Sequence, residues 1–88
     1  MKTAFLAPFA RDLRRVTDKR ISDQVRSAIE AVESAPDLRA ISGLKKLQGT
    51  GPYFRIRVGE YRIGLRVDGD TLTFMRVLPR KDIYRHFP

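Results

Sequence analysis

Arginines and one late tyrosine are the residues whose types and spacing could carry chemistry. The candidates are Arg55, Arg57, Arg62, Arg80 and Tyr84. Guanidinium groups present forked donors that match phosphate oxygens, and they keep their charge at any relevant pH. RNA can be cut without a metal if the ribose 2′-hydroxyl is deprotonated, the phosphorane charge is stabilised and the departing 5′-oxygen is protonated. Fixed cations suit the stabilising part of that work, and an aromatic ring can stack on a base or supply a hydroxyl.

Simpler interpretations of the same residues stay open at this point. Arginines that alternate with apolar residues are also typical of an ordinary solvated face of an antiparallel sheet. A tyrosine such as Tyr84 is often a half-buried packing residue. His86 is the only histidine, which excludes a mechanism with two histidines. The sequence has no cysteine and no clustered set of histidine and carboxylate ligands, so we expect neither a metal nor another cofactor.

Composition indicates one basic domain spanning residues 1–88. The 42% of hydrophobic residues suffice for one modest core, and 18 basic against 10 acidic residues give a net charge of +8. Such a charge favours a polyanionic partner, either a nucleic acid or an acidic protein segment. The first eight residues resemble neither a signal peptide nor a membrane span, and the absence of cysteine fits a reducing compartment. We therefore expect a cytoplasmic protein without membrane contact.

The first half of the sequence predicts a strand and two helices. Residues 3–6 form a plausible strand, and Pro8 can occupy the first turn of a helix that carries Phe9, Leu13 and Val16. Asp18 can cap a second helix, which should end at 35–36 before a proline. Its apolar residues recur at the spacing of one buried stripe: Ile21, Val25, Ala28, Ile29 and Val32. The two helices should form an antiparallel hairpin.

The second half predicts an antiparallel meander after a connection at 36–52, which could contain one more helical turn. Three β-rich runs at 53–58, 61–67 and 71–78 are separated by short turn sequences. Alternation places the arginines of the first two runs on one face and the apolar residues on the other. The third run blurs this pattern, as a strand covered on both sides would. Residues 79–88 could form a last helical turn beside the arginine face.

This sequence resembles the RelE/ParE superfamily of toxins over nearly its whole length. The most specific segment runs from Arg55 to Arg62, with the pattern R-I-R-V-G-x-Y-R, and 80–85 is similar to the basic, tyrosine-containing closing segment of the family. The resemblance implies an α+β fold, in which an N-terminal strand and an antiparallel helical hairpin pack on an antiparallel sheet whose last three strands form a meander. It also implies a cognate antitoxin as partner.

For the RelE-type branch, the resemblance implies ribosome-dependent cleavage of messenger RNA in the A site. By motif, Arg62 and Arg80 match residues that stabilise phosphate and transition-state charge, Arg55 and Arg57 match positioning residues, and Tyr84 matches a residue for stacking or proton transfer. Further basic residues are expected to contact RNA: Lys45, Lys46, Arg66, Lys81, Arg85 and His86. The expected partners are thus the antitoxin, the ribosome and messenger RNA.

Two positions depart from the RelE pattern, and two other functions compete with cleavage. Some RelE-type members carry lysine where Arg55 and Arg57 stand, and many carry histidine at the position of Pro79. Arginine is a poor general base because its pKa exceeds about 12. The identity of the base and acid therefore stays open among Tyr84, His86, the ribosome and the RNA. The alternatives are a ParE-like toxin that inhibits DNA gyrase, and an inactive member that only binds its antitoxin.

Overall fold

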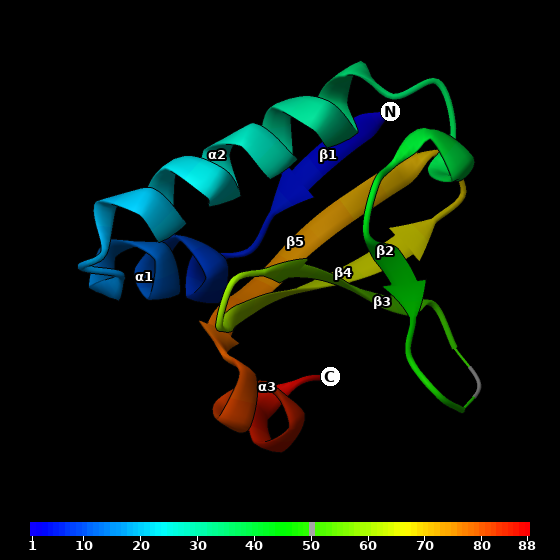
Figure 1. The fold of residues 1–88 in the computed structure, drawn as a ribbon. Coiled ribbons are helices and arrows are strands. Elements are labelled where there is room, and N and C mark those ends of the chain that lie inside the picture. The colour runs from blue at the N-terminus through cyan, green and yellow to red at the C-terminus, as the bar shows by residue number, and fades with distance from the viewer. Residues whose placement is uncertain (50) are drawn as a thin grey trace.

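A computed structural model describes residues 1–49 and 51–88; Thr50, within the predicted connection at 36–52, lies outside the described residues. Figure 1 shows two helices on one side of a twisted sheet and a third on the other side. In chain order the elements are β1 (Lys2–Phe5), α1 (Ala7–Arg15), α2 (Lys19–Ser34), a short 3₁₀ helix (Leu38–Ala40), β2 (Leu44–Lys46), β3 (Tyr53–Val58), β4 (Tyr61–Asp68), β5 (Thr71–Pro79) and α3 (Arg80–His86). The predicted α+β class is confirmed.

The five strands form one sheet in the order β1-β5-β4-β3-β2. The predicted meander of β3, β4 and β5 is confirmed, but the sheet is mixed and not antiparallel throughout. β1 lies parallel to β5, with Lys2 opposite Thr71 and Phe5 opposite Phe74. Strand direction relative to a partner so far along the chain is not encoded in local alternation, which explains this error in the prediction.

Within the connection at 36–52, the predicted extra helical turn is present as the 3₁₀ helix, but β2 was not predicted. Its residues Leu44, Lys45 and Lys46 pair antiparallel with β3. A run this short contains too few residues for alternation to be recognised. β2 is therefore a strand because it pairs with β3, and it brings two lysines to the edge of the sheet beside Arg55.

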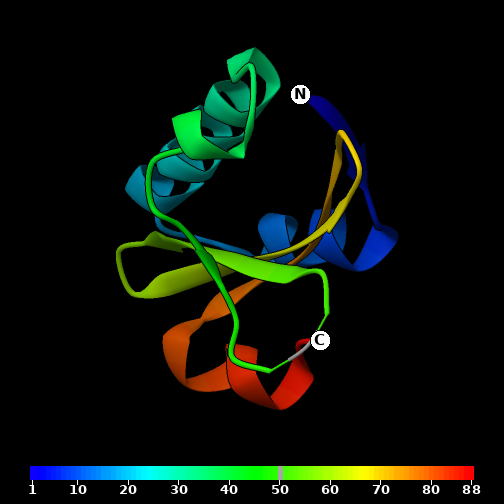
Figure 2. The same ribbon diagram turned by 90° about the vertical axis from the view of Figure 1, so that its right-hand side faces the viewer.

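The helical hairpin forms as predicted, and both helices begin at the expected signals. Pro8 lies in the first turn of α1, where a missing backbone N–H costs nothing. The carboxylate of Asp18 accepts a hydrogen bond from the backbone N–H of Arg20 at 2.9 Å and caps α2. α2 ends at Ser34, just before the Ala35-Pro36 stop. Figure 2 shows α2 crossing one face of the sheet with α1 beside it.

The core lies between this hairpin and the apolar face of the sheet. Phe9 of α1 and Val25 of α2 are buried against residues of the sheet such as Ile63 and Phe74. The exposed fractions of Val25, Ile63 and Phe74 are zero. In β3 and β4, the apolar residues face the hairpin and the arginines face away, as alternation predicts. The reverse face of β3 and β4 therefore carries arginines and does not contribute to this core.

A β-bulge explains the blurred pattern of β5. Leu65 pairs with Phe74 and Gly64 pairs with Arg76, so Met75 has no direct partner on β4. The extra residue shifts the phase of the strand, and Phe74 and Val77 therefore both face the core. The expectation of a central strand covered on both sides is confirmed, since β5 lies between β1 and β4 and contacts both α1 and α3, and the bulge accounts for the change of phase.

Beyond the end of β1, the edge of β5 is covered by a residue that the sequence did not bring forward. Asp12 of α1 is buried, and its Oδ2 accepts hydrogen bonds from the backbone N–H of Val77 at 3.2 Å and from Nε of Arg76 at 2.7 Å. A second bond from Arg76 Nη2 reaches Asp12 Oδ1 at 3.1 Å. The pair ties the first helix to β5.

No helix in the described part of the chain is long and apolar enough to cross a membrane.

Candidate RNA-binding site

α3 packs on the reverse face of the sheet, opposite the hairpin, as the sequence predicted for residues 79–88 (Figure 1). The backbone N–H of Arg80 donates to the carbonyl oxygen of Glu60 at 2.7 Å, which fixes the start of the helix against the turn between β3 and β4. Ile83 and Phe87 are buried beneath α3, with exposed fractions of 1% and 5%. Tyr84, between them in sequence, is 61% exposed. α3 therefore presents Arg80 and Tyr84 beside the arginines of the sheet.

Arg62 is the buried centre of this face, with an exposed fraction of 5%. Its Nη1 donates hydrogen bonds to the carbonyl oxygens of Gly59 at 2.8 Å and Tyr61 at 2.9 Å. The turn that supplies these carbonyls is tight, and Gly59 adopts a φ of 56° there. Neutral carbonyl groups thus hold the guanidinium group, and no carboxylate lies within ion-pair distance of it among the described residues.

Cations stand directly opposite one another on neighbouring strands of this face. Arg57 of β3 pairs in register with Arg62 of β4, and Lys45 of β2 pairs with Arg55 of β3. Like charges at directly opposed positions of a sheet are destabilising. Carboxylates or neutral residues opposite these cations would make the sheet more stable. We call Arg55, Arg57, Arg62 and Arg80 the arginine cluster.

The positive charges of the cluster act together on Arg62. Burial lowers the pKa of Arg62 from its ordinary value, and the positive charges of Arg57, Arg55 and Arg80 lower this pKa further. Tyr84 acts on the same pKa in the opposite, raising direction. The structure therefore brings together all five residues that were predicted to act in chemistry. Their mutual repulsion would be relieved by an anion, and a phosphate group matches guanidinium donors in charge and shape.

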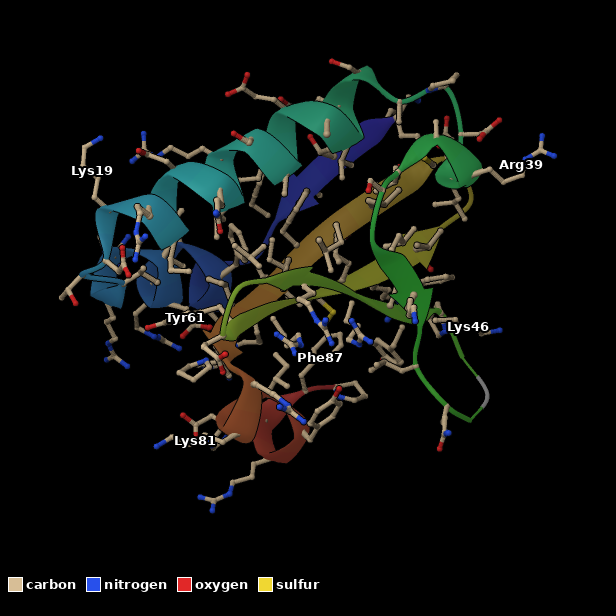
Figure 3. The ribbon with its side chains drawn as sticks, in the orientation of Figure 1. Lys19, Arg39, Lys46, Tyr61, Lys81 and Phe87 are labelled. Carbon is tan, nitrogen blue, oxygen red and sulfur yellow. The ribbon has the colours of Figure 1, made fainter. Side chains whose placement is uncertain are left out.

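An open groove of about 530 Å³ runs beside the cluster, between β2 and α3. Lys45, Lys46, Arg55 and Tyr84 line it, and the ring of Phe87 closes one side. Figure 3 shows Lys46 at the edge of the sheet and Phe87 between the sheet and α3. The groove thus combines basic side chains with an exposed aromatic ring, which is the composition that single-stranded nucleic acid prefers. Leu47 and Gln48 also line it, and sequence reasoning did not single out either.

The other residues predicted to contact RNA are not all in one place. Lys81 lines a second hollow with Arg80 and Tyr84. Arg85 is exposed on α3, and Arg66 pairs with Asp68 at 2.9 Å. His86 lies in a separate groove, whose lining includes Asp12, Tyr61 and Arg76. The groove beside the cluster is thus lined by Lys45 and Lys46 but not by Arg66, Arg85 or His86.

Comparison with known proteins agrees with this fold. Residues 4–84 match the family model of the ParE toxin of type II toxin-antitoxin systems, parDE. The chain is 43% identical to Toxin RelE3 of Methanocaldococcus jannaschii, over 100% of both chains. It is similar to the toxin of the RelB-RelE antitoxin-toxin complex from Methanococcus jannaschii, with a TM-score of 0.81, 41% identity and coverage of 97% of this chain and 99% of the other.

A second solved structure, of the RelBE2 toxin-antitoxin complex from Mycobacterium tuberculosis, matches with a TM-score of 0.71 and 28% identity over 90% of this chain and 96% of the other. The chain therefore belongs to the ParE toxin family, within the RelE/ParE superfamily of toxins from type II toxin-antitoxin systems. Inside this superfamily its likeness in sequence and fold is to RelE toxins. The family inferred from the segment 55–62 and the closing residues is confirmed.

Proposed function

We propose that this toxin inhibits translation by cutting messenger RNA in the A site of the ribosome. The observation that carries this proposal is the arginine cluster, which gathers three guanidinium groups around that of Arg62 without a neutralising carboxylate among the described residues. A buried cation surrounded by cations is costly for a fold, and such conflicts are expected at functional sites. Binding of an RNA backbone would supply the missing negative charge.

In the proposed reaction, the ribose 2′-oxygen attacks the adjacent phosphorus and the bond from phosphorus to the 5′-oxygen breaks. The products are a 2′,3′-cyclic phosphate and a 5′-hydroxyl end, so the proton lost by the 2′-hydroxyl is balanced by one gained at the leaving oxygen. Arg62 and Arg80 stabilise the charge that develops on the phosphorane, because cations held in position before the reaction act where that charge appears. Arg55 and Arg57 orient the phosphate backbone. No metal has a part in this scheme.

We assign Tyr84 to base stacking. Its ring is largely exposed and borders the groove that also contains Arg55, where a base of single-stranded RNA could lie against it. The guanidinium groups keep their protons, so the chain's arginines do not act as the base. Proton transfer to and from the RNA then falls to groups of the ribosome and of the RNA itself.

The partners of this toxin follow from the same charges. Solved relatives are complexes with the antitoxin RelB, and we propose that this chain is likewise paired with a cognate antitoxin. A net charge of +8 would speed encounter with an acidic antitoxin segment. The proposed site of action is the cytoplasm, where ribosomes and messenger RNA are found.

The test is to induce the chain in bacteria without an antitoxin and to map new 5′ ends of messenger RNA. Cleavage within translated frames that depends on active ribosomes is the expected result, and Arg80→Ala should remove most of it. Arg39→Ala is the matched control, because this exposed arginine lies far from α3 and pairs with Asp37 (Figure 3). Intact messages during growth arrest would refute the proposal.

Gyrase inhibition is the second candidate, because the matching family model is that of the ParE toxin. A supercoiling assay with purified toxin separates the two functions. Impaired supercoiling with intact messages would assign the toxin to the ParE branch. Neither effect, with antitoxin binding preserved, would identify an inactive member of the family.

A further inference from the structure

α3 carries two of the five proposed site residues, yet it is a helix of only seven residues. Isolated helices of this length are not stable in water, so tertiary contacts must hold it. Its first residue is held by the hydrogen bond from Arg80 to Glu60 and by direct continuity with β5. Its other end needs a separate anchor, and the contacts of Phe87 provide one.

The ring of Phe87 lies against the backbone of Gly64 in β4. A Cβ atom built on Gly64 would stand 2.8 Å from Cγ, Cδ1 and Cδ2 of this ring, closer than real Cβ atoms approach other atoms. Tyr53 of β3 meets the same ring edge to face, with centroids 5.6 Å apart and an interplanar angle of 87°. Gly64 stands between Arg62 and Arg66 along its face of the strand, so the ring is seated among the arginines.

This anchor is separate from the main core. The cluster of buried residues between the hairpin and the sheet does not include Phe87, which lies on the opposite face with Ile83. Loss of its ring should therefore leave the five-stranded sheet and the hairpin folded. What would change is the position of the last turn of α3, and with it Tyr84, which lines the same groove as Phe87.

We propose that Phe87, seated on Gly64, is a positioning residue that holds the last turn of α3, and with it Tyr84, against the arginine cluster. This inference rests on the proposed RNA-cleaving function. Gly64 is required there because any larger residue would lift the ring. Phe87 itself need not contact RNA for this role, since it acts through the placement of α3.

The first experiment compares Phe87→Ala with the unchanged toxin in two measurements. Hydrogen exchange should accelerate at the amides of α3 and stay slow in β4 and β5. Cleavage on programmed ribosomes should fall about 10- to 100-fold in kcat with little change in KM, because misplacement costs chemistry more than docking. Phe87→Leu should recover part of the loss. Phe5→Ala, which removes a half-exposed phenyl ring on another part of the molecule, should leave cleavage unchanged.

The second experiment is a double-mutant cycle between the ring and the glycine. Gly64→Ala should reduce cleavage in the unchanged background by displacing the ring, and it should cost nothing further when Phe87 is already alanine. Equal losses from Gly64→Ala in both backgrounds would overturn the proposed contact. Unchanged kcat in Phe87→Ala, despite faster exchange in α3, would overturn the positioning role.

The two proposals fail in different ways. Unchanged toxin that cuts no messenger RNA would refute the cleavage function alone, because hydrogen exchange would still report whether Phe87 holds α3. If exchange in α3 were also unaffected by Phe87→Ala, the anchor itself would be disproved.

Discussion

Arg62 is buried and Arg76 is partly buried, and their surroundings are opposite. The guanidinium group of Arg76 meets the buried carboxylate of Asp12 through two hydrogen bonds, and the bond from Nε is 2.7 Å long. Arg62 is more deeply buried, yet it is held by two carbonyl oxygens and surrounded by the positive charges of other arginines. The hydrogen bond to Asp12 raises the pKa of Arg76, whereas burial and like charges lower that of Arg62.

The difference separates a structural cation, Arg76, from Arg62, the cation that we propose to act in function. Arg76 has its counter-charge within the fold, and the pair joins α1 to β5 across 64 residues of sequence. Arg62 lacks such a partner in the described part of the chain, so its charge is available to an external anion. A buried charge without a partner lowers stability, and a fold retains it where function requires it. The following predictions, from the largest effect to the smallest, test this distinction.

Asp12→Ala should produce the largest loss of stability. It would leave the guanidinium group of Arg76 without its carboxylate and the backbone N–H of Val77 without its acceptor. We expect the free energy of unfolding to fall by about 3 kcal/mol, as for other broken buried ion pairs. Urea denaturation measures this change. A loss below about 1 kcal/mol, the range of exposed pairs, would show that the pair is not structural.

Arg62→Met should have the opposite effect: a large loss of cleavage without a loss of stability. We expect kcat for cleavage to fall about 100- to 1000-fold, as when one preorganised donor is removed from other active sites. The free energy of unfolding should be unchanged or higher, because a similar apolar side chain replaces an uncompensated charge.

The matched control for this substitution is Arg76→Met. It should lower stability, because it leaves Asp12 buried without its cation, and the folded fraction should still cleave at the normal rate. If both methionine variants lose stability equally and both retain cleavage, the distinction between the two arginines is wrong.

Substitutions of Tyr84 should have an intermediate effect and define its role. Tyr84→Ala removes the exposed ring and should lower cleavage about 10- to 100-fold, in line with the worth of one base stack. Tyr84→Phe keeps the ring and should retain most of the rate. Single-turnover cleavage on ribosomes measures both variants. A Tyr84→Phe variant as slow as Tyr84→Ala would assign the hydroxyl to proton transfer.

Asp23→Ala should have the smallest effect. Its carboxylate pairs with Lys19 one helical turn away at 3.0 Å, and both side chains are largely exposed. Such pairs contribute about 0.3–0.5 kcal/mol, and salt screens them. Urea denaturation at low and high salt should show a loss near this size that shrinks as salt is added. A loss comparable to that of Asp12→Ala would remove the contrast between surface and buried pairs.

Much of the fold was predictable because its signals are local. The cap at Asp18, the proline in the first turn of α1 and the alternation of β3 and β4 each depend on residues close in sequence. The same alternation placed Arg55, Arg57 and Arg62 on one face. α3 was expected beside them, and the order of elements was enough to recognise the family.

The sequence by itself thus determined the layers, the apolar face and the family of this toxin, because periodicity and capping act over a few residues. Only the tertiary structure decided the parallel pairing of β1, the formation of β2, and the pairing of Arg76 with the carboxylate of Asp12. It also decided that Phe87 sits on Gly64. These features join residues distant in sequence, and their energies depend on burial and close contact, which no local pattern of residue types records.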